Sequence, residues 1–257
     1  MTERLAVVTG AARGIGAAVA TRLAGDGWSL LLVDACAPQP PADYPMPAPE
    51  DLAAVARDCA AAGAGAVEEL LADVGDGSVR GQLRTLLAGR APAAVVAAAG
   101  VIRGDTAWAI PDDAFELMLR VNLSGVRYLA DACVPAMIEA GAGRFVAVSS
   151  AAALRAMPGL SAYSAAKGAV VGYVRALAAD LAGTGVTANV VCPGSTRGAM
   201  CWPPAPSSMT CPARRASPPR PCCTGCSSPA RSRRPSRGCA VPTPVPSLAR
   251  SSPSTRA

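Results

Sequence analysis

Short runs of consecutive apolar residues recur along roughly the first 190 residues of this chain, and segments of helical composition separate them. Such runs are typical of strands buried on both faces, as in a parallel sheet covered by helices. The pattern predicts strands at 5–8, 28–33, 67–72, 93–98, 144–149 and 186–192. It predicts helices at 17–25, 51–62, 78–88 and 161–182, one or two long helices within 112–140, and a proline-rich, ordered or half-ordered loop at 36–50. We therefore expect a single α/β domain with a doubly wound parallel sheet.

Composition divides the chain near residue 200. Residues 201–257 contain nine Arg, thirteen Pro and eleven Ser but no Asp or Glu. The whole chain has 24 basic and 18 acidic residues, so the first 200 residues carry 15 and 18, a net charge of −3, and the tail carries +9. The positive charge therefore gives no reason to expect nucleic-acid binding by the domain. Because proline interrupts helices and strands, we expect a domain over 1–200 and a disordered tail over 201–257.

Several classes of protein are excluded by composition. The chain contains no histidine, which excludes a Ser-His-Asp hydrolase. The cysteine cluster at 222–226 lacks a histidine or a second cysteine pair to complete a zinc site, so we expect no metal. No uninterrupted apolar run is long enough to cross a membrane, and the first residues do not have the pattern of a signal peptide. We expect a cytoplasmic protein without a membrane partner.

A glycine-rich turn follows the first predicted strand directly, with the sequence Thr9-Gly10-Ala11-Ala12-Arg13-Gly14-Ile15-Gly16. Glycines allow the backbone to approach a pyrophosphate, and the start of the next helix offers free N–H groups. Many turns between a strand and a helix contain two glycines for packing alone. The position after the first strand nevertheless favours a dinucleotide site.

Asp34 ends the second predicted strand, 18 residues after Gly16. A carboxylate there can accept hydrogen bonds from ribose hydroxyls and repels a 2′-phosphate, so it favours NAD over NADP. Arg13 favours NADP instead, since a guanidinium in the turn can bind the 2′-phosphate. The alternative for Asp34 is a solvated strand end. Asp73 and Val74, which follow the third predicted strand, are expected to border the adenine.

Tyr163 and Lys167 are four residues apart in a predicted helix, which places both side chains on one face. A nearby ammonium lowers the pKa of a phenol, so we expect Tyr163 to exchange a proton with an alcohol oxygen. Lys167 is the only lysine among 24 basic residues, which indicates a position that needs a compact ammonium. The alternative is an exposed helix lysine without a function.

Two further polar residues are candidates for the same site. Ser150 follows the fifth predicted strand, 13 residues before Tyr163, where strand ends face the ligand crevice. We expect its hydroxyl to hold and polarise the substrate oxygen, with Ser149 as the alternative. Asn122 lies in an apolar helical stretch, where it either satisfies its hydrogen bonds internally, caps a helix, or holds a water in a proton relay.

Taken together over about 200 residues, these motifs resemble the short-chain dehydrogenase/reductase family. The resemblance implies a Rossmann-type fold and a catalytic set of Asn122, Ser150, Tyr163 and Lys167. It implies that the dinucleotide site also includes Ala99, Gly100, Pro193, Gly194 and Thr196, and that Lys167 holds the nicotinamide ribose. In homo-oligomers of the family, the interfaces between subunits are formed by the helices that carry Asn122 and Tyr163 and by a seventh strand. We do not expect the tail to supply that strand.

Two segments resemble the mycofactocin-coupled subgroup, namely 36–52 and 193–200. That resemblance implies NAD that stays bound without exchange, and mycofactocin, a peptide-derived redox cofactor, as the partner that reoxidises it. The chain departs from the family at 97–100, where Ala-Ala-Ala-Gly replaces Asn-Asn-Ala-Gly. It also has Gly198 where a threonine commonly holds the carboxamide, and we expect Thr196 to substitute.

The composition of the tail suggests a frame shift in the gene near Cys201. Read one base earlier with open third bases, 230–240 permits an apolar helix and 241–257 permits a strand that leads to Pro-Val-Asp-x-Gly. Both resemble elements that the family has at its C-terminal end, and sequencing the coding DNA tests the hypothesis. We expect an oxidoreductase that acts on a secondary alcohol or ketone. The alternatives are a dinucleotide-binding pseudoenzyme or sensor that the tail makes inactive, and a nucleic-acid binder that uses the tail's arginines.

Overall fold

The computed structural model describes residues 4–196. The chain divides into two units, Met1–Met209 and Thr210–Ala257, and every described residue belongs to the first. The predictions about the disordered tail, the shifted frame, the cysteine cluster at 222–226 and Gly198 lie outside the described residues.

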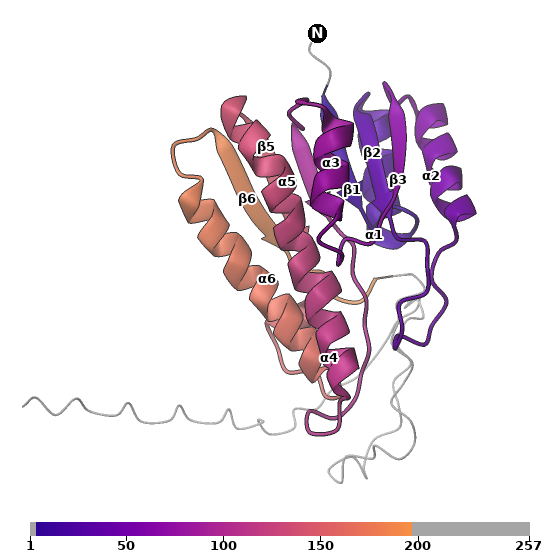
Figure 1. Cartoon of the computed structure of the whole chain (residues 1–257), viewed down its shortest axis with the longest axis vertical. Helices are drawn as coiled ribbons and strands as arrows, with labels where there is room; N and C mark the ends of the chain where they lie inside the picture. Colours follow the sequence, from indigo (N-terminus) through magenta and orange to yellow (C-terminus); the bar gives the residue numbers. More distant parts are fainter. Residues whose placement is uncertain (1–3, 197–257) are drawn as a thin grey trace, which may run out of the picture. The chain divides into compact units, whose positions relative to one another are not determined.

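Six strands, all paired in parallel, form one sheet in the order β3-β2-β1-β4-β5-β6 (Figure 1). The order runs outward from β1 to β3 and then restarts on the other side of β1 with β4, which confirms the predicted doubly wound parallel sheet. The carboxyl ends of the strands therefore meet at one edge, at the switch between β1 and β4. The strands are β1 (Leu5–Thr9), β2 (Ser29–Asp34), β3 (Val67–Leu71), β4 (Ala94–Ala97), β5 (Gly143–Val148) and β6 (Val186–Val191).

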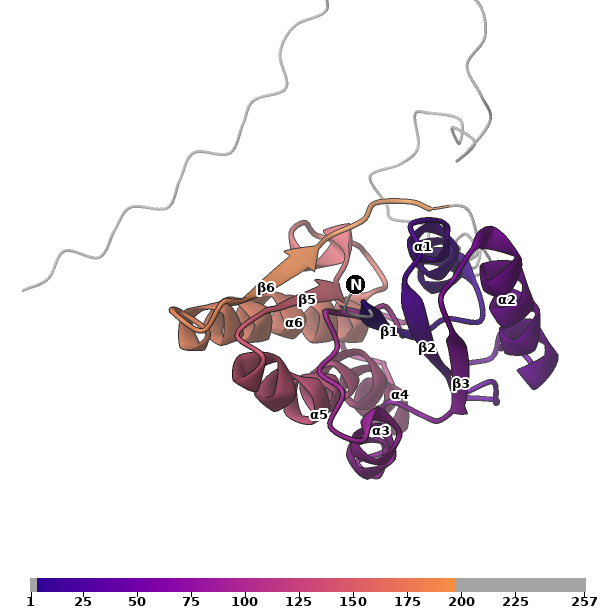
Figure 2. The same cartoon turned by 90° about the horizontal axis from the view of Figure 1, so that it is seen from above.

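Helices cover both faces of the sheet, as Figure 2 shows from above. One face carries α1 (Gly14–Gly25) and α2 (Pro49–Ala62), and the other carries α3 (Val79–Leu87), α4 (Asp112–Leu119), α5 (Gly125–Glu139) and α6 (Ser161–Asp180). Successive side chains of each strand point to opposite faces of the sheet, which gives one apolar core under each layer of helices. Val7 and its partner Leu31 belong to the apolar core on the α3–α6 side, whereas Val8 and its partner Leu32 belong to the core under α1 and α2.

Of the one or two helices predicted within 112–140, the structure has two. A π-helical turn, Arg120–Ser124, separates α4 from α5, and the N–H of Gly125 donates to the carbonyl of Arg120 five residues earlier. Gly125 packs directly on Val74, since a Cβ at position 125 would lie 2.8 Å from Val74 Cγ2. The extra residue in the turn therefore brings the start of α5 against the segment that follows β3.

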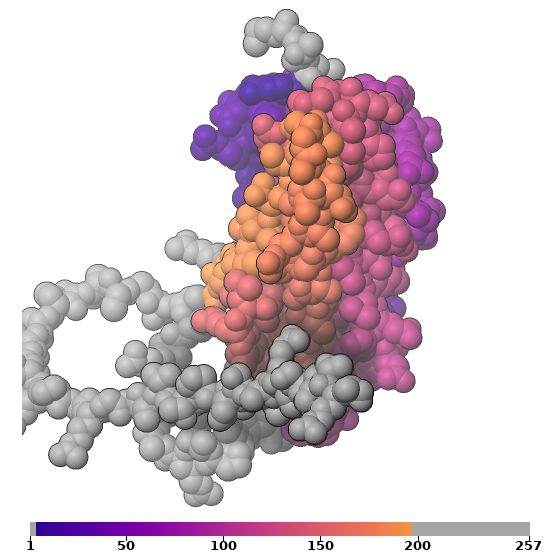
Figure 3. Space-filling view, turned by 90° about the vertical axis from the view of Figure 1, so that its left-hand side faces the viewer, coloured from indigo at the N-terminus to yellow at the C-terminus, as the bar shows by residue number. Residues whose placement is uncertain are grey.

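Figure 3 views the described residues from the side of β6 and α6. β6 is the last strand of the sheet among residues 4–196, and its burial alternates, with Val186 and Ala188 buried and Thr187 exposed. Within the same residues, no helix is both long enough and apolar enough to cross a membrane.

Candidate active site

The glycine turn joins β1 to α1 at the carboxyl edge of the sheet. Gly10 has a φ of +66°, and a Cβ there would lie 2.7 Å from Ala99 Cα, so the turn touches the end of β4. A Cβ on Gly16 would lie 2.1 Å from the carbonyl oxygen of Gly10. Gly14, with φ +61°, faces open space, and half-buried Ile15 follows it. The turn therefore combines tight backbone packing with one open side, which is the shape that a pyrophosphate requires.

Thr9 supports this arrangement, although its place in the glycine motif predicted no separate role for it. Its side chain is buried, and its Oγ1 accepts a hydrogen bond of 3.3 Å from the N–H of Ala99. Residues 97–99, at the end of β4, are alanines, and the Thr9 hydroxyl joins the ends of β1 and β4.

Asp34 lies beside the glycine turn. Its Oδ2 accepts from the N–H of Ala12 at 3.0 Å, and its Oδ1 accepts from the N–H of Cys36 at 3.2 Å. The carboxylate is thus fixed between the turn and the chain that leaves β2, where a solvated strand end would have no such bonds.

The Arg13 side chain is held by the β2–α2 loop, residues 35–48. Its Nη1 donates to the carbonyl of Pro45 at 2.7 Å, and its Nη2 donates to Met46 Sδ at 3.6 Å. The guanidinium carbon also lies 5.9 Å from the centre of the Tyr44 ring. These contacts direct the Arg13 guanidinium towards the loop.

Asp73 and Val74 follow β3 at the same edge. Asp73 Oδ1 accepts from the N–H of Gly75 at 2.8 Å, and Asp73 Oδ2 forms an ion pair with Arg120 Nη1 at 2.5 Å. Val74 is buried against Gly125. Both Asp73 oxygens therefore have protein partners at the carboxyl edge of the sheet.

Asn122 lies in the π-helical turn and is fully buried. Its Oδ1 accepts from the N–H of Val101 at 3.2 Å, and its Nδ2 donates to the carbonyls of Val101 at 2.9 Å and Met118 at 3.0 Å. Of the roles considered for Asn122, the structure shows the first: its side-chain amide forms its hydrogen bonds within the protein. The side chain ties the segment after β4 to the helical layer.

Gly100 separates Asn122 from Lys167. A Cβ at position 100 would lie 2.8 Å from Asn122 Oδ1 and 3.2 Å from Lys167 Nζ. No larger residue fits between them without moving one of these polar groups.

Lys167 is only 4% exposed, so the alternative of an exposed helix lysine is wrong. Its Nζ donates to the carbonyl of Val148 at 2.9 Å. Burial lowers the pKa of Lys167 to about 8, while nearby Cys192 opposes the shift. The ammonium is therefore held at the carboxyl end of β5.

Tyr163 lies on the same face of α6, with its ring centre 5.9 Å from Lys167 Nζ. Burial raises the pKa of Tyr163, and hydrogen bonding with Ser150 lowers it in part. The net direction is upward, opposite to the lowering that we expected from Lys167. The physical reason is that desolvation of the phenolate outweighs the stabilising contacts, and that the Lys167 Nζ bonds to a backbone carbonyl.

The two neighbouring serines have different surroundings. Ser150 is the one that contacts Tyr163, and its Oγ also accepts from the N–H of Ala152 at 3.1 Å. Ser149 is buried, and its Oγ donates to the backbone carbonyl of Lys167 at 2.8 Å. The structure thus brings Ser150 to the phenol, whereas Ser149 anchors α6 to β5.

The segment after β6 reaches the same edge. The carbonyl of Pro193 accepts from the N–H of Ala151 at 2.8 Å, which joins this segment to the turn that carries Ser150. Gly194 and Thr196 are exposed, and a Cβ on Gly194 would have open space around it.

The β2–α2 loop also contributes Tyr44, which the sequence singled out only as part of a loop. Tyr44 Oη accepts from the N–H of Ile102 at 3.1 Å. Burial raises the pKa of Tyr44, the Ile102 bond and Arg13 oppose the rise, and Tyr163 adds to it. Tyr44 therefore lies near the phenol of Tyr163, a long-range proximity that its sequence position could not have shown.

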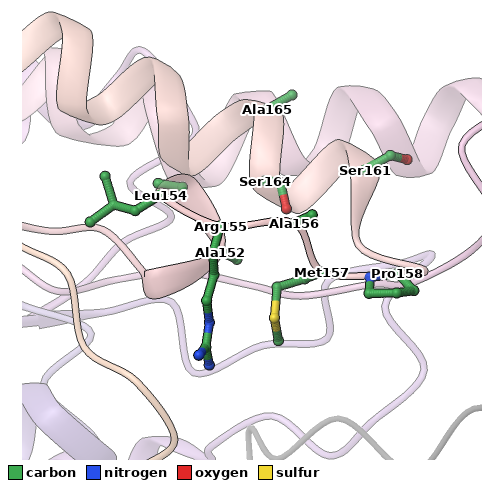
Figure 4. A pocket seen from close by; sticks show the side chains of 10 residues that line it. Ala152, Leu154, Arg155, Ala156, Met157, Pro158, Ser161, Ser164 and Ala165 are labelled. Atoms are coloured by element: carbon green, nitrogen blue, oxygen red, sulfur yellow. The ribbon is translucent and has the colours of Figure 1, made fainter. Parts of the chain in front are cut away.

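A cavity of about 630 Å³ lies between residues 152–158 and the first turns of α6 (Figure 4). At about 100° per residue, Ser161, Ser164 and Ala165 are turned by about 100° to 160° around α6 from Tyr163. The cavity therefore opens mainly on a helix face away from the phenol. It is lined by Ala152, Ala153, Leu154, Arg155, Ala156, Met157, Pro158, Ser161, Ser164 and Ala165.

Comparison with known proteins agrees with this geometry. The family model for short chain dehydrogenases matches residues 4–205. An uncharacterized NAD-dependent oxidoreductase of Mycobacterium tuberculosis is 39% identical over 210 residues, which cover 79% of this chain and 74% of that protein. The (-)-trans-carveol dehydrogenase of Rhodococcus erythropolis is 35% identical over 202 residues, which cover 74% of this chain and 70% of that protein. The crystal structure of carveol dehydrogenase from Mycobacterium avium in complex with NAD matches with a TM-score of 0.74 and 31% identity. The match covers 77% of this chain and 72% of that one.

Proposed function

We propose, since the chain belongs to the short-chain dehydrogenase family, that it transfers a hydride between NAD and the carbon of a secondary alcohol or ketone. The observation that carries this proposal is the cluster of Ser150, Tyr163 and Lys167. It combines a phenol, a serine hydroxyl that lowers the pKa of that phenol in part, and a buried ammonium 5.9 Å from the centre of the phenol ring. Such a cluster can hold a substrate oxygen and exchange one proton with it, which is what the reaction needs besides a hydride carrier.

The turn between β1 and α1 fits a dinucleotide. Its open side at Gly14 leaves room for the pyrophosphate, and the tight packing at Gly10 and Gly16 admits no side chain that would fill the cradle. When bound, the dinucleotide supplies the hydride chemistry. We assign its site to Gly10, Arg13, Gly14, Ile15, Gly16, Asp34, Asp73, Val74, Ala99, Gly100, Tyr163, Lys167, Pro193, Gly194 and Thr196.

NAD is the preferred form in this proposal. The Asp34 carboxylate lies beside the turn, where it can accept hydrogen bonds from ribose hydroxyls and repels a 2′-phosphate. Arg13 contacts Pro45 and Tyr44, so its guanidinium already has partners. The two Mycobacterium proteins named above, one NAD-dependent and one NAD-bound, support the same choice.

Tyr163 is the proposed acid and base. In alcohol oxidation the phenolate accepts the hydroxyl proton, and in ketone reduction the phenol donates it back. Ser150 holds the same substrate oxygen, while the Lys167 ammonium contacts the nicotinamide ribose. Because burial raises the pKa of Tyr163, the phenol is the main form at neutral pH, and alcohol oxidation should accelerate as the pH rises.

We also propose that this chain keeps its NAD between turnovers and passes the electrons to mycofactocin. Two observations support this. The segments 36–52 and 193–200 resemble the mycofactocin-coupled subgroup. Hydrogen bonds attach the β2–α2 loop to segments at the carboxyl edge of the sheet. The bonded pairs are Gln39 with Arg120, Pro41 with Arg103, Tyr44 with Ile102, and Pro45 with Arg13.

A dinucleotide-binding protein without turnover is the second candidate, because the proline-rich composition of 201–257 does not predict a seventh strand. One experiment separates the two. The purified full chain is denatured to measure its nucleotide content, and the native protein is mixed with secondary alcohols and ketones and a dye electron acceptor. We expect bound NAD and dye reduction with at least one alcohol. Bound NAD without turnover of any compound would favour the second candidate.

A further inference from the structure

Arg120 joins three segments that are far apart in the sequence. Its Nη1 contacts Asp73 Oδ2 at 2.5 Å, and its Nη2 donates to Gln39 Oε1 at 2.9 Å. Asp73 follows β3, Gln39 lies in the β2–α2 loop and is 8% exposed, and Arg120 opens the π-helical turn. One guanidinium therefore connects the loop to the proposed adenine side of the dinucleotide site.

The shape of the backbone around Arg120 is matched to this contact. A Cβ on Gly75 would lie 2.8 Å from Arg120 Nη1 and 3.1 Å from Arg120 Cγ. The arginine side chain thus lies across the bare Cα of Gly75. At the other end of the same π-helical turn, Gly125 packs on Val74. The turn therefore contacts the whole segment 73–75, and Arg120 extends that contact to the loop.

The chemistry of the contact requires arginine. A guanidinium presents its N–H groups in a rigid fork and can serve two acceptors at once, whereas the ammonium of lysine is a point charge on a flexible stem. The side chains of Arg120 and Asp73 are 41% and 26% exposed, so solvent screens their charge attraction. The directed pair of hydrogen bonds, rather than the charge alone, is what holds Gln39 in place.

We propose that Arg120 is a positioning residue that fastens the β2–α2 loop over the dinucleotide site and so sets how fast the dinucleotide leaves. The inference rests on the proposed function, because it takes the dinucleotide to lie between Asp34, where the loop begins, and Asp73. Release of the dinucleotide then requires the bond between Gln39 and Arg120 to open.

The test compares dissociation rates of NADH in the full chain, by following the NADH fluorescence over minutes to hours after mixing with excess competing nucleotide. Arg120→Lys and Gln39→Leu should each raise the rate about tenfold, and the double variant should show no further increase, since both changes break one contact. Gly75→Ala should act like Arg120→Lys, because the added methyl displaces the guanidinium. Arg84 on α3 has a guanidinium that bonds to Asp131 on α5, so Arg84→Lys is the matched control and should stay within about twofold of wild type.

The rate of the first turnover separates positioning from general damage. It should stay within about twofold in Arg120→Lys and Gln39→Leu while NADH dissociation accelerates. Unchanged dissociation in both variants, or additive effects in the double variant, would overturn the proposal. If Arg120→Lys does not fold, Gln39→Leu in the loop decides the question alone.

Hydrogen–deuterium exchange without added NAD distinguishes this inference from the proposed function. Exchange in 36–48 should be faster in Arg120→Lys than in wild type, whether or not the protein turns over. If the wild-type chain binds NAD but exchange is unchanged in the variant, the fastening role fails and the proposed function stands. If exchange accelerates but the wild type binds no dinucleotide, the contact is real and the proposed function fails.

Discussion

The ammonium of Lys167 lies 5.9 Å from the centre of the Tyr163 ring and donates to the carbonyl of Val148 at 2.9 Å. The two side chains share a face of α6 because they are four residues apart. Gly100 and Asn122 close the space around Nζ. The position therefore suits a compact cation near the ring of the proposed acid and base.

Replacing Lys167 tests that fit. Lys167→Arg should lower kcat for alcohol oxidation about a hundredfold, because the planar guanidinium needs space that Gly100 and Asn122 occupy. Arg175→Lys, on the exposed side of α6, should leave kcat within about twofold. Steady-state rates of both variants give the answer, and near-normal kcat in Lys167→Arg would show that any cation suffices.

The titration of Lys167 should appear in the stability of the protein. Burial lowers its pKa to about 8 from 10.5. Between these values the unfolded chain binds a proton that the folded chain lacks, so this residue makes the free energy of unfolding rise with pH. Across the window, the wild type should gain on the order of 3 kcal/mol relative to Lys167→Met. Urea unfolding below pH 8 and near pH 10.5 measures it, and parallel pH profiles would contradict the buried ammonium.

Gly16 should tolerate no side chain. A Cβ there would lie 2.1 Å from the carbonyl oxygen of Gly10, so Gly16→Ala must displace backbone and should cost roughly 3 kcal/mol of unfolding free energy. Gly168→Ala, where a Cβ meets open space within α6, is the matched control and should stabilise the chain by about 0.5 kcal/mol. Equal effects of the two substitutions in urea unfolding would mean that the turn packs differently.

Asn122 is predicted to matter for folding. Asn122→Leu would leave the N–H and carbonyl of Val101 buried without their partner, which should lower the free energy of unfolding by about 3 kcal/mol. Asn122→Asp keeps the shape and one acceptor but loses both donated bonds, and it should also destabilise. Thermal and urea unfolding of both variants measure the loss. If the free energy of unfolding fell by less than about 1 kcal/mol, the structural role would be wrong and the alternative of a residue that holds a relay water would be favoured.

The sequence was sufficient to predict the sheet and most of the site's placement. Apolar runs such as those around Val7 and Leu31 mark buried strands directly, and the carboxyl ends of parallel strands meet at one edge. That rule placed Asp34, Asp73 and Ser150 at the same edge. The spacing of Tyr163 and Lys167 fixed their common face once the helix was assigned.

The remaining features depend on long-range packing. The π-helical turn at Arg120–Ser124 has no local sequence signal, and its position follows from the contact of Gly125 with Val74. Tyr44 reaches Ile102 across 58 positions of sequence, and Arg120 reaches Gln39 across 81. The direction of the Tyr163 pKa shift was missed because desolvation is set by everything that packs around the ring.

The central claim is that Tyr163 exchanges the proton while NAD carries the hydride, and a single turnover of the full chain and of Tyr163→Phe tests it most directly. Native mass spectrometry first establishes the chain mass and the NAD bound to each protein. The NAD-loaded proteins are then mixed with an oxidisable secondary alcohol, and the absorbance of the reduced nicotinamide is followed. We expect both proteins to hold NAD and the phenylalanine variant to react about a thousandfold more slowly. Equal rates in the two proteins, or a wild-type chain that binds no NAD, would contradict the account.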